Sequence, residues 1–146
     1  MTAKIYPYLT FENAKEAMDY YVQNFGAEIL YHQPLSEEQA ENIGLSTDDL
    51  AATTAYGEFS VAGKKIVCAD ATMGNPQTST LISIMLSFGD EKEAARQFFK
   101  QLADSDDQRV TVPFGNWISG SMMGQIVDHY GLTWIICTGN NTAEEE

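Results

Sequence analysis

The sequence contains one segment that occurs twice. Residues 8–25 read YLTFENAKEAMDYYVQNF and residues 85–102 read MLSFGDEKEAARQFFKQL, and the two align without gaps at an offset of 77 positions. Both copies carry the same Leu, the same Phe and the same Lys-Glu-Ala triplet, and several other apolar positions agree in type. Because repeated segments tend to form the same local structure, this offset predicts a chain built from two copies of one unit.

Each copy predicts a strand followed by a helix. Apolar residues recur at helical spacing after Asn13 and after Asp90, and both residue types are suited to cap a helix N-terminus. Gly26 supplies a stop signal for the first helix. The predicted buried stripes are Ala14, Ala17, Met18, Tyr21 and Phe25 in the first helix and Ala94, Ala95, Phe98 and Leu102 in the second.

The ends of the two halves also correspond. Residues 63–69 (GKKIVCA) and 131–138 (GLTWIICT) each place a turn glycine before a short apolar strand that ends in Cys, with one extra residue in the second copy. Further strands are predicted within 27–33, 54–61, 110–114 and 116–128. The predicted fold class is therefore α+β, with two tandem βαβββ modules in a single domain spanning 1–146. The modules cover about 3–71 and 80–138, the connection is about 72–79, and a disordered acidic tail covers about 139–146.

The charge of the chain excludes some classes of partner. Eight Lys and Arg against 21 Asp and Glu give a net charge of −13, which repels nucleic acid and anionic membranes. The apolar runs are too short to span a membrane, and the start lacks the pattern of a signal peptide. We therefore expect a cytoplasmic protein in which Cys68 and Cys137 are reduced and buried. Residues 36–49 contain five acids and no base, which predicts a solvated loop, with a mobile flap as the alternative.

Paired βαβββ modules resemble the vicinal oxygen chelate superfamily, which includes glyoxalase I, extradiol dioxygenases and bleomycin-resistance proteins. Residues 6–29 (YPYLTFENAKEAMDYYVQNFGAEI) and 128–136 (DHYGLTWII) are similar to its PhnB-like branch. The resemblance covers nearly the whole chain. It implies that each module curls an antiparallel-rich mixed sheet into a half-open cup, that the two modules form a cleft, and that the protein forms a homodimer.

The resemblance also implies where a metal would be held, because superfamily members bind it through the first and last strands of each module. The corresponding positions, exact or within a residue, are Tyr6, Ser83, Ile66 and Ile135. None of these side chains is an imidazole, carboxylate or thiolate, the groups that divalent first-row metals prefer. His32 and His129 form no HxH or HxxxH motif. We therefore predict no metal ligand and no cofactor, with a divalent metal as the alternative.

Strand alternation identifies the side chains that should line the cleft. Residues on the mixed polar and aromatic face of each predicted strand are assigned to the cup, and the uniformly apolar face is assigned to the helices. The predicted lining is Tyr6, Tyr8, Tyr56, Glu58, Ser83, Met85, Trp117 and Trp134. Such a surface suits flat hydrophobic ligands or cationic ones. The alternative is that the tyrosines fill the cup or a dimer seam.

Three functional hypotheses follow. The first is a metal-free protein that binds a small aromatic or cationic molecule. The second is an enzyme of the same superfamily, a lyase or isomerase or a dioxygenase relative, that uses a divalent metal or Glu58. Burial in the cup would raise the pKa of Glu58 toward the range of a general base. The third is a non-catalytic structural or regulatory dimer.

Overall fold

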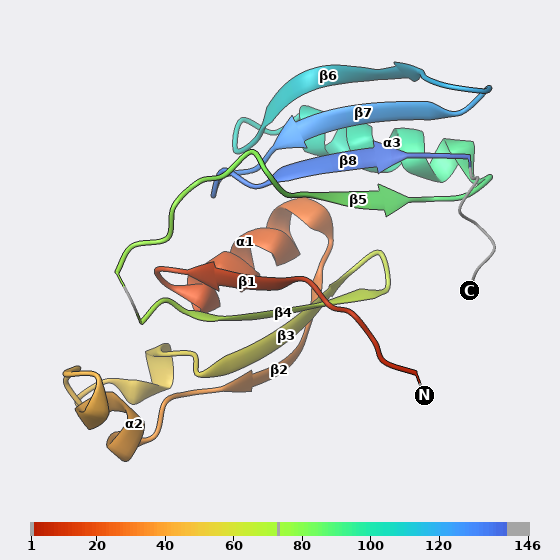
Figure 1. Ribbon diagram of the computed structural model, residues 1–146. Helices are drawn as coiled ribbons and strands as arrows, with labels where there is room; N and C mark the ends of the chain where they lie inside the picture. Colours follow the sequence, from red (N-terminus) through yellow and green to blue (C-terminus); the bar gives the residue numbers. More distant parts are fainter. Residues whose placement is uncertain (1, 73, 140–146) are drawn as a thin grey trace. The chain divides into compact units, whose positions relative to one another are not determined.

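The computed structural model describes residues 2–72 and 74–139 and divides into two compact units, Met1–Gln77 and Thr78–Glu146 (Figure 1). The boundary between them falls inside the predicted connection at 72–79. Each unit contains one βαβββ module, which confirms the predicted fold class. The predicted tail at 139–146 lies outside the described residues except for Gly139.

The first unit contains one four-stranded mixed sheet and the helix α1. Its elements are β1 (Tyr8–Phe11), α1 (Ala14–Phe25), β2 (Glu28–Gln33), α2 (Glu37–Asn42), a 3-10 turn η1 (Leu50–Ala52), β3 (Tyr56–Val61) and β4 (Lys64–Asp70). The strand order is β1-β4-β3-β2, with β1 parallel to β4 and the other neighbours antiparallel. The strand β1 therefore lies at one edge of the sheet, beside the last strand of its unit.

The second unit repeats this arrangement. Its elements are β5 (Ser83–Ser87), α3 (Lys92–Ala103), β6 (Arg109–Asn116), β7 (Met122–Val127) and β8 (Thr133–Cys137). The strand order is β5-β8-β7-β6, with β5 parallel to β8 and antiparallel pairing elsewhere. Among the described residues, no helix has the length and apolar character needed to cross a bilayer.

The helix α1 forms as the sequence predicts. The side chain of Asn13 accepts a hydrogen bond from the Glu16 amide at 3.0 Å, and Gly26 ends the helix with a φ of 67°. The predicted apolar stripe is buried, and the Tyr21 ring stacks on Phe59 with ring centroids 5.1 Å apart. The core of the first unit therefore lies between α1 and one face of its sheet.

The helix α3 differs from the prediction in two ways. Its N-cap is Glu91, which makes no side-chain cap hydrogen bond, so the assignment of Asp90 was wrong. Ala94 is exposed and Phe98 is half-buried, whereas the buried aromatic residue is Phe99. Phe99 is the buried ring because the sheet leaves room for it at Gly124. A Cβ atom on Gly124 would lie 2.6 Å from Cε1 of Phe99, so the absent side chain leaves the room that this ring fills.

The acidic segment 36–49 is not simply a solvated loop, because it contains the helix α2. A capping box starts this helix: the Ser36 hydroxyl accepts from the Gln39 amide, and the Gln39 side chain accepts from the Ser36 amide. Ala40 is fully buried and anchors the helix, while its three glutamates are exposed. The prediction of exposed acidic side chains was correct, but the local structure was missed.

Strand register shows how the two modules correspond. Tyr8 pairs with Val67, and Met85, its equivalent at the offset of 77, pairs with Ile135. Val67 and Ile135 are therefore equivalent, and each stands four residues after its turn glycine. The register continues without a gap, because Leu9 pairs with Cys68 and its equivalent Leu86 pairs with Ile136. The two cysteines are therefore not equivalent, and the extra residue inferred by aligning them was wrong. Both cysteines are free and buried, as predicted.

Candidate functional site

The exposed side of the first sheet gathers all three tyrosines that the sequence predicts to bind a ligand. Cross-strand pairs place Tyr8 beside Val67, Val67 beside Glu58, and Glu58 beside Tyr31, so these residues form one row across all four strands. Side chains on the other face of β3, such as Phe59, are buried. We call the exposed cluster the tyrosine face, and its members are Tyr6, Tyr8, Tyr31, Tyr56, Glu58 and Lys65.

Glu58 is the most connected member of the tyrosine face. The Tyr56 hydroxyl donates a hydrogen bond to its Oε2 at 2.6 Å, and the Lys65 ammonium lies 3.3 Å from its Oε1. The hydrogen bond from Tyr56 is the main reason why the pKa of Glu58 lies below its ordinary value, and Lys65 lowers it further. This direction is opposite to the predicted one, because the two partners outweigh the effect of burial.

Aromatic rings surround this carboxylate. The rings of Tyr31 and Tyr56 lie 6.1 Å apart at 57°, and the Lys65 ammonium lies 5.5 Å from the centre of the Tyr6 ring. The hydrogen bond to Glu58 is also the main cause that raises the pKa of the Tyr56 phenol, which therefore stays protonated and remains a donor. The face thus combines ring surfaces with one fixed anion and one internal cation.

We expect Tyr56→Phe to raise the pKa of Glu58, because the variant removes the largest cause of its lowered value. A carboxylate with a lowered pKa stabilises the folded state at neutral pH and loses that contribution as the pH falls through its titration range. The variant should therefore show a weaker loss of stability on acidification. Carbon-13 NMR titration of the glutamate carboxyl groups measures the pKa directly.

Tyr31→Phe is the matched control for this experiment. The Tyr31 hydroxyl lies 2.5 Å from Oε1 of Gln33, so its loss should leave the titration of Glu58 unchanged. An unchanged Glu58 pKa in Tyr56→Phe, or an equal rise in both variants, would contradict the assigned hydrogen bond.

The structure brings together some of the predicted site residues and separates others from them. Tyr6, Tyr8, Tyr56 and Glu58 share the tyrosine face of the first unit. In the second unit, Ser83 and Met85 are exposed on one face of β5, and Met85 pairs with Ile135. Trp117 is 42 % exposed and follows β6, where its amide donates to the Ser121 carbonyl in the turn before β7.

Trp134 is a correction. Its side chain is 1 % exposed, and its indole N–H donates to Oδ2 of Asp128 at 2.9 Å. It pairs with Ile84 and Ile126 across the sheet, on the face opposite Met85. Alternation along β8 therefore places Trp134 in the core of its unit rather than in a ligand-binding lining.

Sequence reasoning missed Tyr31 and Lys65. Tyr31 lies in the segment 27–33 that the sequence predicts as a strand, but the position of this strand beside β3 was not visible in the sequence. The sequence places Lys65 only within the apolar strand pattern of 63–69. Its approach to Glu58 depends on the pairing of β3 with β4, in which Glu58 lies opposite Val67.

The positions where superfamily members would hold a metal can now be placed. Val67, rather than Ile66, lies on the same face of the first sheet as Tyr8. In the second sheet, Ile135 lies on the same face as Met85. Within residues 2–72 and 74–139, no group of three or more His, Cys, Asp or Glu side chains is arranged to hold a metal ion. His32 Nε2 instead lies 2.9 Å from the Thr53 carbonyl oxygen. The absence of a bound metal stays a prediction.

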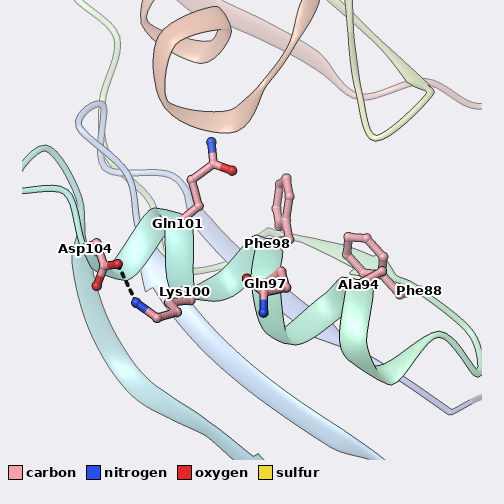
Figure 2. Close-up of a pocket in the computed structure, with 7 residues that line it drawn as sticks. All are labelled: Phe88, Ala94, Gln97, Phe98, Lys100, Gln101 and Asp104. Carbon is pink, nitrogen blue, oxygen red and sulfur yellow. Dashed lines mark hydrogen bonds and ion pairs between the residues drawn. The ribbon is translucent and has the colours of Figure 1, made fainter.

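A separate surface pocket lies on α3 in the second unit (Figure 2). Its lining includes the rings of Phe88 and Phe98, 5.5 Å apart, and the ion pair of Lys100 with Asp104 at 2.9 Å. The remaining lining residues are Ala94, Gln97 and Gln101. This pocket contains none of the predicted site residues and no grouping of catalytic type, so the tyrosine face is the stronger candidate site.

Comparison with known proteins supports the fold and its family. Residues 3–137 match the family described as 3-demethylubiquinone-9 3-methyltransferase. Protein YjdN of Escherichia coli (strain K12) is 27% identical over 139 residues, which cover 89% of this chain and 91% of that protein.

Solved structures show the same architecture. A PhnB protein from Bacillus cereus is 26% identical, with a TM-score of 0.66 over 94% of this chain and 100% of that one. A glyoxalase/bleomycin resistance protein/dioxygenase from Alicyclobacillus acidocaldarius is 13% identical, with a TM-score of 0.63 over 94% of this chain and 91% of that one. At this lower identity the similarity shows the fold alone.

Proposed function

The chain belongs to the PhnB-like family described as 3-demethylubiquinone-9 3-methyltransferase, within the glyoxalase/bleomycin-resistance superfamily, and from this premise we propose that it binds a small aromatic or cationic molecule without a metal. The observation that carries the proposal is the tyrosine face. Four exposed phenol rings and one oriented, half-buried carboxylate lie together on one face of the first unit. Stacking and cation–π contacts with such rings bind flat or cationic ligands.

Binding is better supported than catalysis by Glu58. A general base works best when its pKa lies near the working pH, and the contacts of Glu58 move its pKa the other way. The name of the family refers to a methyl transfer. However, the sequence contains no GxGxxG loop of the kind that follows a strand in many sites for dinucleotides or methyl donors.

A thermal-shift screen tests the proposal. Small aromatic compounds, neutral and cationic, are added to the full chain with and without divalent metal ions. A ligand that binds only the folded state raises the unfolding midpoint. We expect a rise that does not require metal, and NMR shift changes centred on Tyr8, Tyr31 and Tyr56.

The variant Tyr31→Ala should weaken binding of the best compound roughly 10-fold, because one stacking ring is lost. Tyr130→Ala, a half-buried tyrosine of the second unit, is the control and should leave the affinity unchanged. A midpoint that rises only with metal would favour the enzyme hypothesis. No rise with any compound would favour the structural or regulatory dimer.

A further inference from the structure

The tyrosine face already contains an ammonium group, and it belongs to the protein itself. The Nζ atom of Lys65 lies 3.3 Å from Oε1 of Glu58 and 5.5 Å from the centre of the Tyr6 ring. Proteins recognise organic ammonium ligands by placing a carboxylate and an aromatic ring next to the cation. The local geometry is therefore that of an ammonium site filled by a side chain.

We propose that Lys65 occupies the ammonium subsite of the tyrosine face, and that the ligand is an organic ammonium compound that displaces it. This inference rests on the proposed binding function and narrows the ligand class from aromatic or cationic molecules to ammonium compounds. It also gives Lys65 an autoinhibitory role, because the free protein must release this contact before the ligand enters.

Lys65 can leave the subsite while the Glu58 carboxylate stays in place. The Tyr56 hydroxyl holds the other carboxylate oxygen of Glu58 at 2.6 Å, which fixes the anion whether or not the lysine is present. The Lys65 side chain is 37 % exposed, and its long, flexible stem can turn into solvent. A partly exposed ion pair of this kind contributes little to stability, so an external ammonium group can compete with it.

The surroundings of the subsite favour a cation with an apolar body. Tyr8 and Tyr31 lie in the same cross-strand row as Glu58 and offer ring surface to the rest of a ligand. The strands β2 and β3, which carry Tyr31 and Tyr56, are joined by the connection that contains α2. The exposed acids of that connection, together with the net charge of −13, raise the local concentration of cations.

Choline and its neutral isostere 3,3-dimethylbutan-1-ol form the probe pair. The two differ in the charge of one group, so the difference in their affinities reports the ammonium subsite. We expect the full-length chain with Lys65→Met to bind choline about 3-fold more tightly than the wild-type chain, measured by NMR titration, because a partly exposed ion pair competes only weakly. The affinity for the alcohol should not change.

Lys64→Met is the matched control, because it removes the same charge from the neighbouring, exposed position of β4. It should leave the choline affinity unchanged. Adding Glu58→Gln to Lys65→Met should abolish the gain. If Lys65→Met is poorly folded by circular dichroism, Lys65→Gln replaces it with the same expected gain.

The proposal is overturned if either Lys65 variant leaves choline affinity unchanged or lowers it. An equal gain for choline and the alcohol would also overturn it, since the lysine would then only block space. A gain that survives Glu58→Gln would do the same. If a neutral aromatic compound binds the tyrosine face while the choline results fail, the proposed function stands without this refinement. If no compound binds, both fail.

Discussion

Phe59→Ala is expected to lower the free energy of unfolding by about 4 kcal/mol, because it removes a fully buried ring from the core of the first unit. Phe59 is 0 % exposed, and its ring stacks on Tyr21 with centroids 5.1 Å apart and an angle of 13°. The substitution loses this contact and leaves a cavity between α1 and β3. Urea-induced unfolding followed by circular dichroism measures the change.

Phe98→Ala is the comparison variant. Phe98 stands at the position of the second copy that corresponds to Tyr21, but it is only half-buried. Its loss should cost about 1 to 2 kcal/mol, since less apolar surface returns to water. Equal losses for the two variants would show that the second unit depends on Phe98 as strongly as the first depends on Phe59.

Asp128→Ala should lower the free energy of unfolding by roughly 3 kcal/mol, because it leaves three hydrogen-bond donors without their acceptor. Asp128 is 4 % exposed, and its Oδ1 accepts from the amides of Tyr130 and Leu132 at 2.9 and 3.0 Å. Its Oδ2 accepts from the buried indole of Trp134. The carboxylate therefore holds the turn between β7 and β8 against the core, and thermal and urea unfolding both report its loss.

Two controls distinguish this role from a general effect of charge. Asp106→Ala removes an exposed carboxylate of the same unit and should change stability by less than about 0.5 kcal/mol. Asp128→Asn keeps one acceptor oxygen and should fall between Asp106→Ala and Asp128→Ala. Near-identical stabilities for Asp128→Ala and Asp106→Ala would show that the turn forms without this network.

The two helices show how far sequence periodicity reaches. In α1 the cap at Asn13, the stop at Gly26 and the buried stripe all follow from local signals, and the structure confirms each. In α3 the same reasoning chose Phe98 over Phe99 as the buried aromatic. Adjacent residues of a helix face different directions, and the choice depended on the room above Gly124 on a strand that follows later in the chain.

In the candidate site, too, the sequence predicts which face of a strand a residue occupies but not its partners on other strands. Alternation along one strand was enough to place Tyr8, Tyr56 and Glu58 on an exposed face. It could not identify Lys65 as the partner of Glu58, nor the direction in which the pKa of Glu58 moves. Both depend on which strands become neighbours and in which register.

By itself, the sequence determined the duplication, the βαβββ order of each unit and most of the face assignments, because these depend on residues a few positions apart and on an offset that can be read directly. Only the tertiary structure decided which side chains meet across strands: Tyr31 with Tyr56, Lys65 with Glu58, and Trp134 with Asp128. The physical reason is that cross-strand register is fixed when distant segments pair. One step of register moves every side chain of a strand to the other face of its sheet.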